Sequence, residues 1–139
     1  MKMCYLVFCG LIAVLVLGCS TQKKECKKMT TVMEKVDNVI VEVRETKFFQ
    51  SNPKSLREIG NRFSKLQKEM KGIPVKTDSL KEAHGNAVQK IDHFASLFMQ
   101  AAQDVERRNQ VGVERAGHML KGAISMWKRA TLDIAKVCK

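Results

Sequence analysis

Apolar residues recur at alternating intervals of three and four positions in four segments of the chain, and this pattern constrains the fold more than any other feature. Such spacing gathers apolar side chains on one face of an α-helix. The chain after Cys19 is therefore expected to be helical throughout. The four apolar stripes are Cys26, Met29, Met33, Val36, Ile40 and Val43; Leu56, Ile59, Phe63, Leu66 and Met70; Leu80, His84, Ala87, Ile91, Phe94, Phe98, Ala101 and Val105; and Val113, Ala116, Leu120, Ala123, Trp127, Ala130, Ile134 and Val137.

Helix-breaking residues bound the first two segments. The first stripe predicts a helix from about Gln22 to Phe49. Asn52 is expected to cap the second helix, with Pro53 at its first position, where the missing N–H is harmless. Gly72 is expected to end that helix in the left-handed conformation.

Weaker signals mark the third and fourth helices. Ser79 and Glu82 have the spacing of a capping box, so the third helix is expected to open at 77–79. The apolar pattern loosens at 109–112, where we expect a turn. Without that turn, the third and fourth helices would continue as one long rod in a three-helix arrangement.

Four amphipathic helices joined by short turns predict an all-α fold: an antiparallel four-helix bundle, up-down-up-down, over residues 19–139. The second helix is shorter than the others by about ten residues. One end of the bundle is therefore expected to be open or to be covered by the loop at 72–78.

The first 18 residues have a different composition. They carry one charge, Lys2, followed by sixteen apolar or small residues from Met3 to Gly18. That is fewer than the roughly 20 residues that a membrane-spanning helix needs. A positive start, a short apolar core and a small residue at its end are typical of a secretory signal. An uncleaved anchor helix and a buried core helix are the alternatives.

The signal ends Val16-Leu17-Gly18-Cys19, without an A-x-A cleavage site. This segment resembles the signal peptide of bacterial lipoproteins, whose lipobox ends in a small residue followed by an invariant cysteine. Gly18 and Cys19 match that pattern, whereas Val16 and Leu17 stand in the reverse of the usual order. The resemblance implies that residues 1–18 are removed, that the Cys19 thiol carries a diacylglycerol and that the new amino terminus is often acylated.

Two cysteines remain after such processing. Cys4 and Cys9 leave with the signal, Cys19 is lipidated, and Cys26 and Cys138 form an even pair in an oxidising compartment. In an up-down-up-down bundle, the start of the first helix and the end of the fourth lie at the same end, so a disulfide between these two cysteines is geometrically plausible. A reactive thiol or a metal pair is the alternative.

The chain is strongly basic, with 25 Lys and Arg against 14 Asp and Glu. A basic surface favours an anionic neighbour. Outside the cytoplasm we expect no nucleic acid, and anionic lipid, lipopolysaccharide or an acidic envelope protein are the candidate partners. Nine lysines are expected at the anchor end and to face the membrane: Lys23, Lys24, Lys27 and Lys28 beside the anchor, with Lys71, Lys76, Lys81, Lys136 and Lys139 from the second turn and the C-terminus. Solubility alone is the alternative explanation.

Few residues are candidates for chemistry. His84 is the only histidine on an apolar stripe, and with Met29 or Met33 it could hold a haem between helices. A partly exposed boundary position is the simpler interpretation of His84, and His93 and His118 are expected to be exposed. We therefore expect no cofactor, no metal site and no catalytic site.

Glycines inside the third and fourth helices offer a weak hint of a binding face. Gly85, Gly117 and Gly122 are expected to permit a close helix approach or to form a groove, since each costs about 1 kcal/mol relative to alanine.

These features together predict a lipid-anchored envelope lipoprotein with a non-catalytic structural or protein-binding role. Serine follows the lipidated cysteine, at Ser20, where lipoproteins of the enteric type that stay in the inner membrane have aspartate. The resemblance therefore implies the periplasmic face of the outer membrane. A haem- or metal-binding bundle and an inhibitor or immunity-type lipoprotein are the alternatives.

Overall fold

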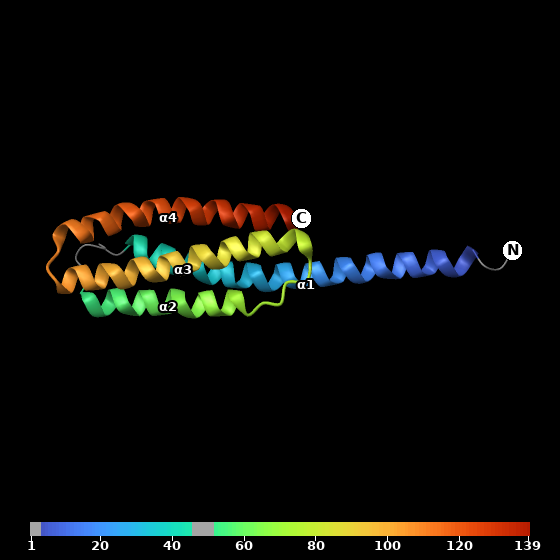
Figure 1. Ribbon diagram of the computed structural model, residues 1–139, viewed down its shortest axis with the longest axis horizontal. Helices are drawn as coiled ribbons and strands as arrows, with labels where there is room; N and C mark the ends of the chain where they lie inside the picture. Colours follow the sequence, from blue (N-terminus) through green and yellow to red (C-terminus); the bar gives the residue numbers. More distant parts are fainter. Residues whose placement is uncertain (1–3, 46–51) are drawn as a thin grey trace.

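The computed structural model describes the backbone of residues 4–45 and 52–139 and the side chains of residues 20–44 and 52–139. Four helices make up this part of the chain (Figure 1): α1 (Cys4–Glu45), α2 (Pro53–Lys71), α3 (Asp78–Glu106) and α4 (Gln110–Val137). No strand occurs in it. The prediction of an all-α antiparallel four-helix bundle is confirmed, because successive helices reverse direction and pack side by side.

Helix α1 is longer than the pattern predicts. It begins at Cys4 and runs without a break through the apolar segment into the bundle. Its first part extends beyond the other three helices, as Figure 1 shows in blue. The predicted end near Phe49 lies outside the described residues. No helix among the described residues has an apolar stretch sufficient to cross a membrane.

The apolar stripes form the core of the bundle. Every member of the first stripe is buried, as are most residues of the other three. Phe63 of α2 stacks on Phe94 and Phe98 of α3, with ring centroids 4.9 and 5.6 Å apart. Full burial of one such side chain contributes about 1.5–3 kcal/mol, so the four stripes supply the main driving force for folding.

The short helix α2 begins with the predicted side-chain cap, but it ends in a different backbone conformation from the predicted one. Asn52 caps it as predicted, since its Oδ1 accepts a 2.8 Å hydrogen bond from the backbone N–H of Ser55. At its other end the expectation of a left-handed Gly72 was wrong. Gly72 has φ −74°, because its N–H and that of Ile73 keep bonding back to the last turn of the helix. The chain then places Ile73 in the core, so the loop covers the end that the shorter helix would leave open.

Helix α3 starts two residues earlier than a capping box with Ser79 as its N-cap would allow. Thr77 is the N-cap residue and its side chain makes no capping hydrogen bond. The predicted Ser79–Glu82 capping box was therefore wrong, because Ser79 already lies within the first turn of the helix. The turn to α4 is 107–109, slightly before the predicted range, and Asn109 caps α4 by accepting from the N–H of Gly112.

Helices α2 and α3 approach each other closely at Gly60. A Cβ atom placed on Gly60 would lie 3.0 Å from the Met99 Sδ atom and 3.3 Å from the Ala95 carbonyl oxygen. Cβ atoms on Gly85 and Gly122 would meet nothing within 4 Å. The first alternative of that prediction, a close helix approach, was therefore wrong at Gly85 and Gly122. The second alternative, a groove, stays a prediction, and Gly117 is buried.

Candidate functional site at the disulfide end

A disulfide joins Cys26 of α1 to Cys138 at the C-terminal cap of α4, with Cα atoms 5.7 Å apart. We call this end of the bundle, which also contains the loop between α2 and α3, the disulfide end. Figure 1 shows the C-terminus at the end of the bundle where α1 enters it. The two cysteines are 112 positions apart, so the bond joins residues close to the two ends of the bundle's sequence.

A hydrogen bond reinforces the disulfide. The Gln22 side-chain amide donates to the Val137 carbonyl oxygen at 2.7 Å. That carbonyl belongs to the last turn of α4, where backbone acceptors have no partner within the helix. Gln22 therefore satisfies one of them and ties α1 to α4 one turn before Cys26.

Glu25 holds the loop between α2 and α3 against α1. Its side chain is only 5% exposed, and its carboxylate accepts hydrogen bonds from the backbone N–H groups of Lys76, at 2.8 Å, and Thr77, at 3.3 Å. Burial raises the pKa of Glu25, but the hydrogen bonds from Lys76 and Thr77 and the Lys76 ammonium outweigh it, so the pKa lies below 4.5.

Sequence reasoning gave Glu25 no role. A signal was present, because Glu25, Met29, Val32 and Val36 are spaced 4,3,4 and share the buried side of α1. An acid on an apolar stripe needs a partner, since an unpaired buried charge is costly. The partner itself, a loop N–H group 51 positions away, has no signature in the sequence.

The four lysines predicted to face the membrane are all exposed on the first turns of α1 inside the bundle. They are Lys23, Lys24, Lys27 and Lys28. Among the described residues, none of the four makes an ion pair. The other five predicted lysines, Lys71, Lys76, Lys81, Lys136 and Lys139, are exposed as well, and all lie in or beside the loop or at the end of α4.

Cys19 lies on α1 seven positions before Cys26. At a rise of about 1.5 Å per residue, that separation is about 10 Å along the helix axis. The side chain of Cys19 lies outside the described part of the structure. The helical backbone between the two cysteines sets their distance.

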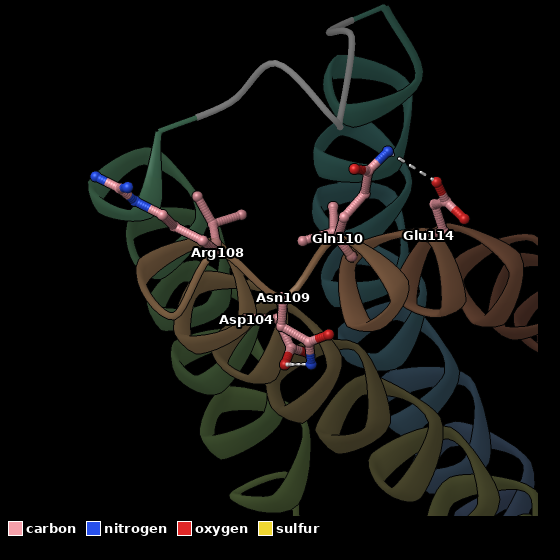
Figure 2. Close-up of a pocket in the computed structure, with 7 residues that line it drawn as sticks. Asp104, Arg108, Asn109, Gln110 and Glu114 are labelled. Atoms are coloured by element: carbon pink, nitrogen blue, oxygen red, sulfur yellow. Dashed lines mark hydrogen bonds between the residues drawn. The ribbon is translucent and has the colours of Figure 1, made fainter.

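A pocket of about 490 Å³ lies at the opposite end of the bundle, which we call the far end, at the turn between α3 and α4 (Figure 2). Four of its polar side chains already bond to one another in two pairs. Asn109 donates to the Asp104 carboxylate at 2.9 Å, and Gln110 donates to Glu114 at 3.2 Å. Figure 2 shows the Arg108 side chain pointing away from the Asp104–Asn109 pair. These contacts stabilise the turn and present no nucleophile with a base beside it.

The histidine and methionines considered for haem lie in the core or at its margin. Met29 and Met33 are buried, and His84 is half-buried with its Nε2 atom 2.8 Å from the Met70 carbonyl oxygen. That contact occupies one ring nitrogen of His84. His118 is exposed as predicted, but the prediction for His93 was wrong because its side chain is half-buried. The described residues contain no group of three or more His, Cys, Asp or Glu placed to hold a metal ion.

Comparison of the chain with protein-family models, with curated proteins and with solved structures found no match.

Proposed function

We propose that this protein is a lipid-anchored lipoprotein of the bacterial cell envelope, with Cys19 as the lipidated residue. The observation that supports the proposal is the continuity of α1 between Cys19 and Cys26. An acyl group on Cys19 would enter the membrane within two helical turns of the disulfide end. The bundle would then sit directly on the lipid surface.

The role that we propose for the bundle is structural or protein-binding and non-catalytic. Three contacts at the disulfide end hold α1, the end of α4 and the loop between α2 and α3 together. They are the Cys26–Cys138 disulfide, the Gln22–Val137 hydrogen bond and the Glu25 contact with the loop. Its interior is filled by side chains from all four helices. A bundle with a filled interior and cross-linked helices is consistent with a protein that binds an envelope partner through its outer surface.

The proposed location is the periplasmic face of the outer membrane. The basis is Ser20, which would directly follow the lipidated cysteine and which, on the resemblance to enteric lipoproteins, does not retain the protein in the inner membrane.

Metabolic labelling with a radioactive fatty acid tests the anchor. The wild-type chain is expected to incorporate label and to remain with membranes, whereas Cys19→Ala should lose the label. Cys9→Ala is the matched control, since it removes a cysteine of the same apolar segment and should leave the label unchanged. Label that persists in Cys19→Ala would refute the proposal. A measured mass equal to that of a lipidated chain whose first residue is Cys19 would support it.

A further inference from the structure

We propose that the disulfide end is a binding surface for anionic lipid headgroups, and that it holds the bundle upright on the membrane. This inference rests on the proposed function, because lipidated Cys19 brings this end to the lipid. It adds a partner, the headgroup phosphate, and an orientation.

The lysines of α1 form the centre of this surface. Lys23, Lys24, Lys27 and Lys28 follow one another at intervals of 1,3,1, which keeps them on one side of the helix. That side is opposite Met29, which is fully buried in the core. Four ammonium groups therefore project outward where α1 leaves the bundle.

The acid that stands among these lysines in the sequence does not neutralise them. Glu25 is buried, and its carboxylate bonds to the backbone N–H groups of Lys76 and Thr77. The Glu25 carboxylate therefore lies inside the protein, whereas the neighbouring lysines are exposed to solvent.

The loop and the C-terminus extend the positive surface around α1. Lys71, Lys76 and Lys139 are exposed and make no ion pair among the described residues. Lys81 and Lys136 pair with Asp78 and Asp133, at 2.7 and 3.3 Å, on exposed parts of the surface. Such pairs are weak, so a phosphate group competes with them readily.

The arrangement favours lipid over an acidic protein as the partner. The lysines surround the exit of α1, the helix that carries Cys19, so any membrane anchor there holds them at the headgroups. Close to an anionic surface each lysine adds to the attraction, which salt screens at separations beyond about 10 Å.

Headgroup binding at this end would stand the bundle on the membrane. Helix α3 has 29 residues, which corresponds to about 43 Å at about 1.5 Å per residue. The far end, with the turn between α3 and α4, would therefore project roughly that distance into the surrounding space.

Site-resolved acetylation of lysines in the full lipidated protein tests this inference. The protein is reconstituted in vesicles of phosphatidylcholine alone or of phosphatidylcholine with phosphatidylglycerol, and acetylation rates are read by mass spectrometry. We expect the rates at Lys23, Lys24, Lys27 and Lys28 to fall about fivefold in the anionic vesicles, and to recover in high salt. Lys54 at the far end and Lys121 on α4 should keep their rates.

Three results would overturn the inference. Equal rates in both vesicles would exclude a headgroup surface and would favour an acidic protein as partner. Equal protection of Lys54 and Lys121 would mean that the bundle lies flat. Protection by inorganic phosphate in neutral vesicles to the same degree would indicate a phosphate site independent of lipid.

A pair of charge-reversal variants provides a second measurement. In the first, Lys23, Lys24, Lys27 and Lys28 become glutamate, and in the control the far-end basic residues Lys54, Arg107, Arg108 and Arg115 become glutamate. Only the first should abolish the protection of Lys71 and Lys76 in anionic vesicles. Fatty-acid labelling is read on both variants, so failure of headgroup binding with the label retained would leave the lipoprotein proposal standing.

Discussion

The indole Nε1 atom of Trp127 donates a 2.7 Å hydrogen bond to the carboxylate of Asp37. Trp127 on α4 is 1% exposed, whereas Asp37 on α1 reaches solvent. Each residue lies eleven positions from the disulfide cysteine of its own helix. The contact is therefore a third link between α1 and α4, after the disulfide and the Gln22–Val137 hydrogen bond, and it lies well inside the bundle. It also provides the acceptor that a buried indole N–H requires.

Replacing Asp37 with alanine should lower the free energy of unfolding by about 1–2 kcal/mol, because the buried Trp127 N–H loses its acceptor. Urea denaturation followed by tryptophan fluorescence measures the change. Asp37→Asn keeps an acceptor oxygen and should lose less. Asp92→Ala, which removes an exposed acid from α3, is the control, and equal unfolding midpoints for Asp37→Ala and Asp92→Ala would contradict the role of this hydrogen bond.

The Glu25 contact should make stability depend on pH. Its pKa is lower in the folded protein than the ordinary value of 4.5, so folding favours the ionised form. The resulting stabilisation is complete above 4.5 and is lost as the pH falls through the lower, folded-state pKa. Glu25→Gln should cost about 1.5–3 kcal/mol at neutral pH, and the difference from wild type should shrink in acid.

Thermal unfolding of both proteins at about pH 7 and about pH 3 measures this effect. Asp92→Asn is the control, because it removes an exposed acid of α3 and leaves the Glu25 contact with the loop intact. A wild-type advantage over Glu25→Gln that stays the same at both pH values would show that charge has no part in the contact.

The disulfide should contribute a large share of the stability. Its cysteines are 112 positions apart, and for a loop of that size the chain-entropy treatment gives on the order of 4–5 kcal/mol as an upper value. Replacing Cys26 and Cys138 together by alanine should lower the denaturation midpoint to that of the reduced wild type. Reducing agent should leave the double variant unchanged. Two free thiols in the oxidised wild type, counted by alkylation and mass analysis, would contradict the bond.

The sequence predicts the helices and the core far better than the contacts at the disulfide end. Burial of an apolar face repeats every turn, so Met29, Val36 and Ile40 are recognisable from spacing alone. Glu25 and Gln22 form hydrogen bonds with backbone groups 51 and 115 positions away. Such long-range contacts do not repeat along the chain, so no sequence pattern indicates them. The wrong cap at Ser79 has the same origin. Spacing describes a local capping box, but the loop before α3 is held by Glu25 from another helix.

Alanine substitutions at glycines inside the helices measure how closely α2 and α3 approach each other. Gly122→Ala on α4 should raise the free energy of unfolding by about 0.5–1 kcal/mol, because alanine has the higher helix propensity and its Cβ would meet nothing within 4 Å. Gly60→Ala should gain less or lose stability, since its Cβ would lie 3.0 Å from the Met99 Sδ atom. Met99→Ala removes the side-chain obstacle and should restore part of the gain from Gly60→Ala when the two changes are combined, since the Ala95 carbonyl oxygen at 3.3 Å remains. Urea denaturation of the single and double variants measures the coupling, and an equal gain from Gly60→Ala and Gly122→Ala would show that the helices have room to spare at Gly60.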